Sequence, residues 1–331
     1  MLRPSGTRTE SYGSPTVWVM TEQVPTEHVS SPSAAAAPGA DGVRPLPSLS
    51  PSRAADFKTC PLLYRFRSID RIPEQPTAEQ VRGTLVHAVL EKLFDSPATA
   101  RTRPLAEEMV EPQWDRLVEE QPEFGTIFEA EGAMTREQFL SSAQDLLGGY
   151  FAVEDPRRLE PAEREQLIEA VLGAEGGEQL LIRGYIDRLD VSPGGDLRVV
   201  DYKTGGAPRE AFEARALFQL KFYALVLWRT RGVVPRVLRL LYLKDAEICD
   251  YTPDAEELTR FEKTLFALWR AIENAIETQD FRPKPSKLCG WCSHQQRCPE
   301  FGGTLPPFPV QVTAQTVDSR QARLLAAQPE G

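Results

Sequence analysis

The sequence contains no apolar stretch near the ~20 residues that a membrane-spanning helix needs. Its longest clear apolar run covers residues 222–228, and the apolar patch at residues 17–20 is too short for a secretory signal peptide. We therefore expect a cytoplasmic protein without a membrane partner. Hydrophobic residues make up 41% of the 331 residues and charged residues 26%, so the chain has enough apolar material for a packed core.

The phosphate-binding pattern G-x-x-x-x-G-K-[ST] is also missing, which excludes a P-loop motor within this sequence. Basic residues are in deficit, with 38 against 48 acidic ones, and the formal net charge is −10. The acidic excess is local, because residues 103–179 alone hold 19 acidic and 6 basic residues. Residues 281–299 hold four basic residues and no acidic one. Such basic segments can bind a polyanion, so the net charge does not exclude a nucleic-acid partner.

Small and turn-forming residues dominate both ends of the chain. Residues 1–48 cannot bury enough apolar surface to offset the entropy of ordering, which predicts a disordered tail. Residues 302–331 have a similar composition, and we expect a flexible C-terminal tail. The folded domain then covers residues 49–301. Within it, residues 103–179 show helical patterns broken by prolines, and we interpret them as an acidic helical insertion that lies away from the substrate.

Apolar periodicity predicts the elements of the folded domain. Helical spacing covers residues 80–94, 208–230 and 254–279, the last with Asp254 as its N-cap. Strand-like patterns cover residues 180–191, 197–203, 237–243 and 247–251. Proline and glycine between the first two strands indicate a hairpin turn. The order of helix, strands, helix, strands and helix predicts an α/β domain with a mixed sheet.

Two aspartates lie at equal distances from the centre of this hairpin. Asp187 and Asp201 are each seven residues from Gly194, so a three-residue loop centred there would place them opposite each other on adjacent strands. Lys203 follows Asp201 by two residues and projects from the same face. Carboxylates paired in this way favour a bound divalent metal such as Mg²⁺. The alternative is a solvent-facing strand with a surface ion pair. A D-x-K pattern without further context favours this alternative over a metal site.

Five cysteines in a chain expected to be cytoplasmic are not expected to form disulfides. Cys289, Cys292 and Cys298 form a compact C-x2-C-x5-C pattern, and Cys60 is the natural fourth ligand. Four thiolates accept either Zn²⁺ or an iron–sulfur cluster, so the pattern leaves both open. Cys249 stands in a strand-like segment, and we interpret it as a buried small hydrophobe.

Several short motifs occur together over residues 49–301. They are S-P-S-R at 50–53, C-P-L-L-Y at 60–64, G-T-L-V-H at 83–87, G-Y-I-D at 184–187, D-Y-K-T-G at 201–205, Q-L-K-F-Y at 219–223 and the cysteine pattern. In this combination the chain resembles the PD-(D/E)XK nuclease superfamily. The resemblance is to its RecB-like branch, which includes the nuclease domains of RecB and AddB and the CRISPR-associated adaptation nucleases. It implies a restriction-endonuclease-like fold, which is a mixed β-sheet core flanked by helices, here with a helical insertion and a C-terminal segment fastened by an iron–sulfur cluster.

The resemblance also implies a metal-dependent DNA nuclease. Asp187 and Asp201, with His87 and the carbonyl of Tyr202, would hold one or two Mg²⁺ or Mn²⁺ ions. These ions would polarise the scissile phosphate and activate water for in-line attack. Lys203 would position that water and stabilise the developing charge.

Further roles follow from the resemblance alone. Gln219 and Tyr223 would line the active site, and either structural support of the sheet or contact with DNA would be their role. Independently of the resemblance, Arg53, Arg183 and Arg188 are candidates for contact with a substrate phosphate. Families with one cysteine before the nuclease core and three after it carry a [4Fe–4S] cluster. The cluster is therefore favoured over zinc, with the ligands Cys60, Cys289, Cys292 and Cys298.

The expected activity is hydrolysis of phosphodiester bonds in DNA repair or recombination, by an exonuclease that acts on linear or single-stranded DNA. A helicase that works with it would be a separate subunit, because this sequence has no P-loop. The alternative is a nuclease-inactive module that binds DNA or serves as a scaffold in a helicase–nuclease complex. Every expected catalytic position is filled, which favours the enzyme over that alternative.

Overall fold

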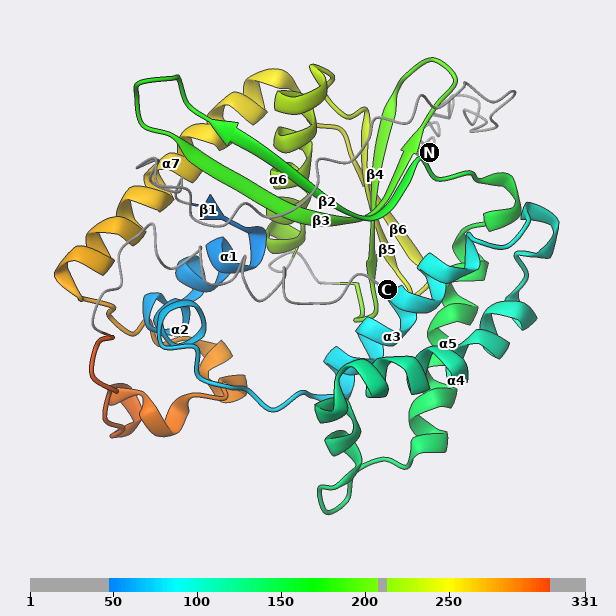
Figure 1. Cartoon of the computed structure of the whole chain (residues 1–331), viewed down its shortest axis with the longest axis horizontal. Helices are drawn as coiled ribbons and strands as arrows, with labels where there is room; N and C mark the ends of the chain where they lie inside the picture. The colour runs from blue at the N-terminus through cyan, green and yellow to red at the C-terminus, as the bar shows by residue number, and fades with distance from the viewer. Residues whose placement is uncertain (1–47, 208–212, 310–331) are drawn as a thin grey trace, which may run out of the picture.

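The computed structural model describes residues 48–207 and 213–309, which surround one mixed β-sheet (Figure 1). Five strands follow the order β1-β3-β4-β5-β6, and β2 pairs with β3. The strands are β1 (Ser48–Leu49), β2 (Glu163–Leu172), β3 (Leu180–Val191), β4 (Leu197–Lys203), β5 (Val237–Tyr242) and β6 (Glu247–Tyr251). The β1–β3 and β4–β5 pairs are parallel and the other pairs are antiparallel. The predicted mixed sheet in an α/β domain is therefore confirmed.

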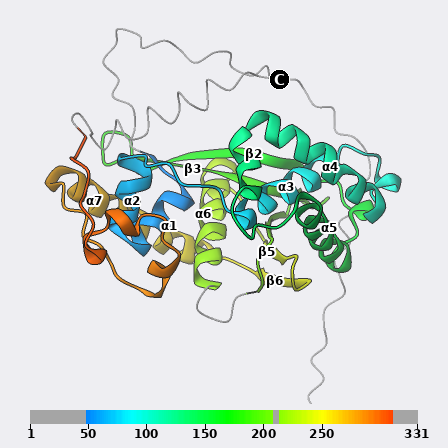
Figure 2. The same ribbon diagram turned by 90° about the horizontal axis from the view of Figure 1, so that it is seen from below.

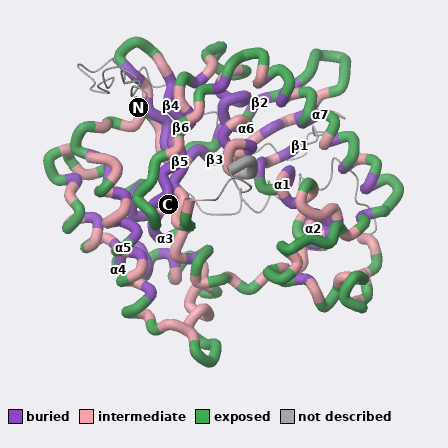
Figure 3. The backbone as a smooth tube through the Cα atoms, turned by 180° about the vertical axis from the view of Figure 1, so that it is seen from behind, coloured by how far each residue is buried: buried purple, intermediate pink, exposed green. Residues whose placement is uncertain are grey.

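Helices pack against both faces of the sheet. They are α1 (Pro51–Thr59), α2 (Pro61–Tyr64), α3 (Ala78–Leu93), α4 (Arg103–Glu120), α5 (Arg136–Val153), α6 (Glu213–Arg231) and α7 (Ala255–Thr278). Figures 1 and 2 show α3, α4 and α5 at one end of the molecule and α1, α2 and α7 at the other, with α6 between them. Each helical group closes its own apolar core against the sheet. The sheet thus lies between two cores, and Figure 3 shows buried residues running along its strands.

Local sequence signals fix the ends of the two predicted helices that matter most here. Thr77 begins α3 with a capping box in which Gln80 returns the hydrogen bond, so α3 presents the next turns in a fixed orientation. Asp254 caps α7 by accepting a hydrogen bond from the Glu257 amide at 2.7 Å, as predicted. Within the described ranges, no helix combines the length and apolar character that a membrane span requires.

The hairpin of β3 and β4 has the predicted register. Ladder pairs run from Val191↔Leu197 to Arg188↔Val200. Beyond Val200, β4 continues to pair with β5 as far as Lys203, whereas β3 pairs along its other half with β1 and β2. The two strands therefore separate directly after Arg188 and Val200, and the fork between them begins at Asp187 and Asp201.

Three expectations about segment boundaries need correction. The helical interpretation of residues 103–179 is wrong at its end, because residues 163–172 form β2 and pair with β3 along nearly the whole strand. The expected C-terminal tail begins too early, because Arg65 donates a hydrogen bond to the Pro306 carbonyl and the Phe308 ring stacks on Phe281 at 6.0 Å. Ser48, assigned to the N-terminal tail, belongs to β1. Both tail predictions otherwise lie outside the described residues, as does the expected start of the helix at 208.

Candidate active site

Three acidic residues form one row across neighbouring strands at the β3–β4 fork. The β2–β3 pairs Arg164↔Arg188 and Gln166↔Ile186 enclose Glu165 and Asp187, so these two acids stand opposite each other. The β3–β4 register continues from Arg188↔Val200 to place Asp201 on the other side of Asp187. The Tyr202 amide donates a hydrogen bond to Asp187 Oδ2 at 2.7 Å. This side-chain contact replaces the ladder bond that the fork removes.

His87 reaches the acidic row from α3. Its Nδ1 lies 3.6 Å from Glu165 Oε1 and 3.5 Å from Asp187 Oδ2. Its Nε2 lies 3.0 Å from the Tyr202 carbonyl oxygen. A carbonyl can only accept, so Nε2 carries the proton and Nδ1 faces the two carboxylates. This orientation is typical of a histidine whose second nitrogen binds a metal.

A glycine one turn earlier brings α3 close enough to the sheet. A Cβ atom on Gly83 would lie 3.2 Å from Thr204 Oγ1, which is tighter than ordinary van der Waals contact. Thr204 directly follows Lys203 at the end of β4. The G-x-x-x-H spacing therefore has a packing reason: the glycine permits the approach and the histidine uses it.

The electrostatics of the cluster are those of crowded carboxylates. Burial raises the pKa of Asp187, and the neighbouring charges of Asp201 and Glu165 raise it further, to about 7. Burial acts in the opposite sense on His87, but the three carboxylates outweigh it and raise the pKa of the imidazole to about 9. Like charges at this separation repel one another unless a cation is held between them.

The donor atoms of this cluster fit a divalent metal. One ligand atom each from His87, Glu165 and Asp187 can be chosen so that all lie within 4.8 Å of one another. Two carboxylate oxygens and an imidazole nitrogen suit Mg²⁺ or Mn²⁺. Asp201, also predicted as a ligand, adjoins the group in the row, but its side chain is 2% exposed and turns toward Lys203. The Tyr202 carbonyl, the remaining predicted ligand, already accepts a hydrogen bond from His87 Nε2.

Lys203 is held by groups from both the sheet and α6. Its Nζ lies 2.6 Å from Asp201 Oδ2 and donates to Gln219 Oε1 at 3.0 Å. The Gln219 amide in turn donates to the Tyr223 hydroxyl at 2.8 Å. Burial, with a smaller contribution from Asp201, raises the pKa of Tyr223 far above its usual range, so its hydroxyl stays protonated. A Cβ on Gly184 would lie 2.8 Å from the Tyr223 ring, which explains a glycine at this position of β3.

Comparison with known proteins identifies the family. A sequence model of the PD-(D/E)XK nuclease superfamily matches residues 48–299, which is most of the chain. The chain belongs to the PD-(D/E)XK nuclease superfamily. This membership makes it a nuclease, and the mixed sheet flanked by helices is the restriction-endonuclease-like fold of that superfamily.

Individual relatives are also similar over much of this nuclease. Gene 69 protein of Mycobacterium phage D29 is 27% identical over 283 residues, which cover 77% of this chain and 98% of the phage protein. Gene 69 protein of Mycobacterium phage L5 is 26% identical over 290 residues, with 77% and 97% covered. A solved structure described as a candidate exonuclease from Eubacterium rectale aligns at 12% identity and a TM-score of 0.44, over 75% of this chain and 88% of that one. The structure of SSO0001 aligns at 14% identity and a TM-score of 0.38, over 77% and 86%.

Glu165 is the site residue that the sequence reasoning missed. It belongs to the acidic block that was expected to lie away from the substrate, yet the β2 part of that block pairs with β3, the strand that carries Asp187. The only signal in the sequence was the mostly apolar stretch at 167–172, which does not alternate, whereas the pairing of β2 with β3 places Glu165 opposite Asp187. Its backbone φ of 43° is in the left-handed region, which is unusual for a residue other than glycine. Such strain often occurs at functional sites.

Arg53, which is predicted to contact a substrate phosphate, is held inside the protein by hydrogen bonds of its own. The residue is 6% exposed. Its guanidinium donates to the Ser48 carbonyl at 3.1 Å and to the Tyr64 hydroxyl at 3.0 Å, and it lies over the Tyr64 ring. These contacts tie β1 and α1 to α2. Arg53 is therefore a structural residue of the α1–α2 corner.

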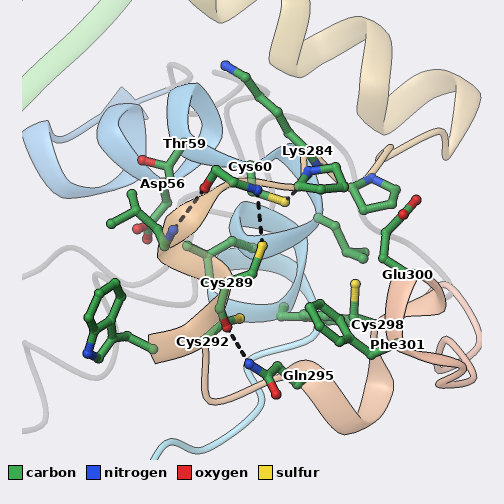
Figure 4. A pocket seen from close by; sticks show the side chains of 18 of the residues that line it. Asp56, Thr59, Cys60, Lys284, Cys289, Cys292, Gln295, Cys298, Glu300 and Phe301 are labelled. Atoms are coloured by element: carbon green, nitrogen blue, oxygen red, sulfur yellow. Dashed lines mark hydrogen bonds between the residues drawn. The ribbon is translucent and has the colours of Figure 1, made fainter.

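The four cysteines of the predicted cluster line one cavity of about 200 Å³ (Figure 4). Cys60 comes from the α1–α2 junction, and Cys289, Cys292 and Cys298 come from the segment after α7. Backbone amides already point at the sulfur atoms: Lys284 N donates to Cys60 Sγ and Ser286 N to Cys289 Sγ, each at 3.3 Å. Burial raises the pKa of the Cys298 thiol, and the Cys60 and Cys292 thiols raise it further. Among the described residues, the group of ligand atoms within 4.8 Å of one another is the one at His87, so the four cysteines share a cavity lining and do not form a closed ligand set.

Proposed function

We propose that this nuclease is a divalent-metal-dependent DNA exonuclease of RecB type, active in DNA repair or recombination. One observation carries the proposal: His87 and three acidic residues converge at the β3–β4 fork, with Lys203 beside them. Each comes from a different element, namely α3, β2, β3 and β4. A surface ion pair, the alternative at a bare D-x-K, would not need a buried aspartate and a histidine held by a backbone carbonyl.

His87, Glu165, Asp187 and Asp201 would hold Mg²⁺ or Mn²⁺, with the Tyr202 carbonyl as a further oxygen at the rim of the site. A bound divalent ion would supply a polarised scissile phosphate and a water of lowered pKa. The chain itself prepares the binding geometry. The Tyr202 peptide holds both Asp187, through its N–H, and His87, through its carbonyl. One rigid peptide therefore orients two of the ligands.

Lys203 would stabilise the negative charge that develops on the phosphate and orient the attacking water. Its ammonium is held between Asp201 and Gln219, which fixes its position before substrate binds. A cation that is already in position needs little reorganisation during the reaction, and it can therefore stabilise the charge that develops in the transition state. Tyr223 supports the amide of Gln219 and acts through it.

We also propose a [4Fe–4S] cluster at Cys60, Cys289, Cys292 and Cys298. The support is the single cavity that the four residues line and the two amide donors at its sulfur atoms. Its role would be structural, because it would fasten the segment after α7 to the start of the nuclease core. Zinc bound by the same four thiolates is the alternative.

The test of the nuclease proposal is a cleavage assay with Mn²⁺ or Mg²⁺ on end-labelled linear DNA and closed circular DNA, both single- and double-stranded. Lys203→Ala and Asp201→Ala are compared with the wild type. Lys92→Ala is the matched control, because it removes a lysine from an exposed pair with Asp95. We expect metal-dependent cleavage of linear DNA that both site variants abolish and the control retains, while circles stay intact.

Cleavage of closed circular DNA would show that the protein is an endonuclease and not an exonuclease. Cleavage that persists in Lys203→Ala and Asp201→Ala would refute the site. If no DNA is cut but DNA still binds, the chain is the inactive binding module, or it needs the separate helicase subunit. Adding a helicase that unwinds the duplex substrate separates these two outcomes.

A further inference from the structure

The β2–β3 ribbon has an exposed apolar pair next to the acidic cluster. Leu167 and Tyr185 are register partners on the two strands. Leu167 is 39% exposed and Tyr185 is 46% exposed. Each stands two residues from a cluster acid, Glu165 on β2 and Asp187 on β3, and therefore on the same face of the ribbon. The pair begins about 7 Å from the acidic row, since two residues of a strand span that distance.

Tyr185 also forms part of the wall of the cavity over the site. This cavity of about 620 Å³ opens between α3 and the β2–β3 ribbon. His87 and Glu165 line it together with Tyr185. A ligand seated in the cavity would thus meet metal-binding groups on one side and an aromatic face on the other.

Single exposed apolar residues are common on protein surfaces and need no explanation. Two of them directly opposite each other, one of which lines an acidic cavity, are a different case. The acidic floor repels phosphate when no metal is bound, so affinity for a nucleotide must come from elsewhere. An aromatic ring supplies it, because base stacking on such a ring is favourable and independent of sequence.

We propose that Tyr185, with Leu167 beside it, is the platform on which a nucleobase next to the scissile phosphate stacks, and that the substrate is therefore a single-stranded DNA end. The proposal rests on the proposed nuclease function and names its substrate class. A base inside a duplex has both faces covered by its neighbours, so only an unpaired or terminal base can offer a free face to the ring. Beyond its end pair, duplex DNA would have to be unwound before it could bind in this way.

The test combines variants of Tyr185 with an abasic scan of the substrate. Single-stranded oligonucleotides carry one abasic residue, moved stepwise from the labelled end, and KM and kcat are measured with Mn²⁺. For Tyr185→Ala we expect a rise in KM of about tenfold or more on unmodified DNA with little change in kcat. Tyr185→Phe keeps the ring and should stay within about twofold. Val171→Ala is the matched control, since it removes another exposed apolar side chain from the same face of β2, farther from the acidic row.

The scan gives the decisive comparison. In the wild type, one abasic position should raise KM as much as Tyr185→Ala does, and in Tyr185→Ala that position should have no further effect. Additive losses, or a flat scan in the wild type, would overturn the platform. Equal KM values for blunt duplex and single-stranded ends would overturn the substrate class.

Equilibrium binding separates this proposal from the nuclease proposal. If the wild type cuts nothing, the anisotropy of the same labelled oligonucleotides still reports whether Tyr185→Ala and the abasic position weaken binding together. If each change alone weakens binding and the two together weaken it no further, the result supports the platform even in an inactive protein. The wild-type abasic scan needs no variant, so it remains informative if Tyr185→Ala fails to fold.

Discussion

The Glu165 carboxylate lies 3.6 Å from Nδ1 of His87, and the backbone of Glu165 adopts a φ of 43° at that position. A left-handed conformation costs a residue other than glycine about 1–2 kcal/mol. The strand tolerates this cost at Glu165, whose side chain meets the His87 imidazole. The contact therefore points to a ligand role for Glu165 beside His87 and Asp187, which predicts a direct effect on metal binding.

Glu165→Gln should weaken Mn²⁺ binding by at least about tenfold, because it removes one charged ligand and keeps the size of the side chain. Isothermal titration calorimetry on the purified protein measures this without reference to activity. Glu79→Gln is the matched control, since Glu79 lines the same cavity from the first turn of α3. Equal affinities of Glu165→Gln and the wild type would remove Glu165 from the metal site.

Metal binding should strengthen as the pH rises. A metal needs neutral His87 and ionised Asp187, whereas the metal-free cluster raises the pKa of His87 to about 9 and that of Asp187 to about 7. Between pH 7 and 9 each bound ion releases about one proton from the imidazole, so affinity should rise about tenfold per pH unit. Below pH 7 both groups release protons and the dependence should steepen. Mn²⁺ titrations followed by electron paramagnetic resonance from pH 6 to 8.5 would measure the slope, and a flat profile would contradict it.

A buried ion pair behind the site should control stability. Arg188 is fully buried and makes two hydrogen bonds to the Glu154 carboxylate, at 2.6 and 2.9 Å, and a third to the Tyr202 hydroxyl at 2.9 Å. Arg188→Ala removes the close partner of the buried Glu154, which keeps only Arg239 at 3.9 Å, while Asp190 keeps Arg198. The free energy of unfolding should therefore fall by about 3–5 kcal/mol. Urea denaturation measures it. Arg270→Ala, which breaks an exposed pair with Glu178, is the matched control and should leave the unfolding transition close to that of the wild type.

The β3–β4 hairpin shows what the sequence could predict. Its two strands alternate or run apolar between clear turn residues, so their bounds and register were predictable, and with them the meeting of Asp187, Asp201 and Lys203. The G-x-x-x-H and Q-x-x-x-Y motifs predicted which helices would face this hairpin through their resemblance to the nuclease superfamily. These are local patterns, and local patterns survive folding when the core requires them.

Glu165 and Arg53 show what the sequence could not predict. β2 lies inside an acidic block whose charge and prolines favour helices and loops, and only its pairing with β3 makes it a strand. Arg53 is an arginine in a motif near the start of the domain, yet burial against Tyr64 decides its role. For Glu165 the missing information is a contact between two strands, and for Arg53 it is the packing of α1 against its neighbour α2. No periodicity within a segment reports which distant segment will cover it.

The cysteine cavity makes a prediction about cofactor content. Protein purified without oxygen should be brown and contain about four iron and four sulfide ions per chain, because four thiolates hold a [4Fe–4S] cluster. Cys289→Ser should lose iron and sulfide together. Cys249→Ser is the matched control, since Cys249 lies on β6 outside the cavity lining. A colourless wild-type protein with one zinc ion per chain would show that the four cysteines bind zinc and not a cluster.

Gln219 should act on the reaction through Lys203. Its Oε1 accepts a hydrogen bond from Lys203 Nζ at 3.0 Å. Once this contact is gone, Asp201 alone would hold the lysine. A charge displaced by a fraction of an ångström stabilises the transition state less but leaves substrate binding intact. Gln219→Ala should therefore lower kcat about tenfold with little change in KM or Mn²⁺ affinity, and Tyr223→Phe should lower it less, because Tyr223 contacts only the far side of the amide. Gln144→Ala, on α5, is the control. A rise in KM with unchanged kcat would instead place Gln219 on the substrate.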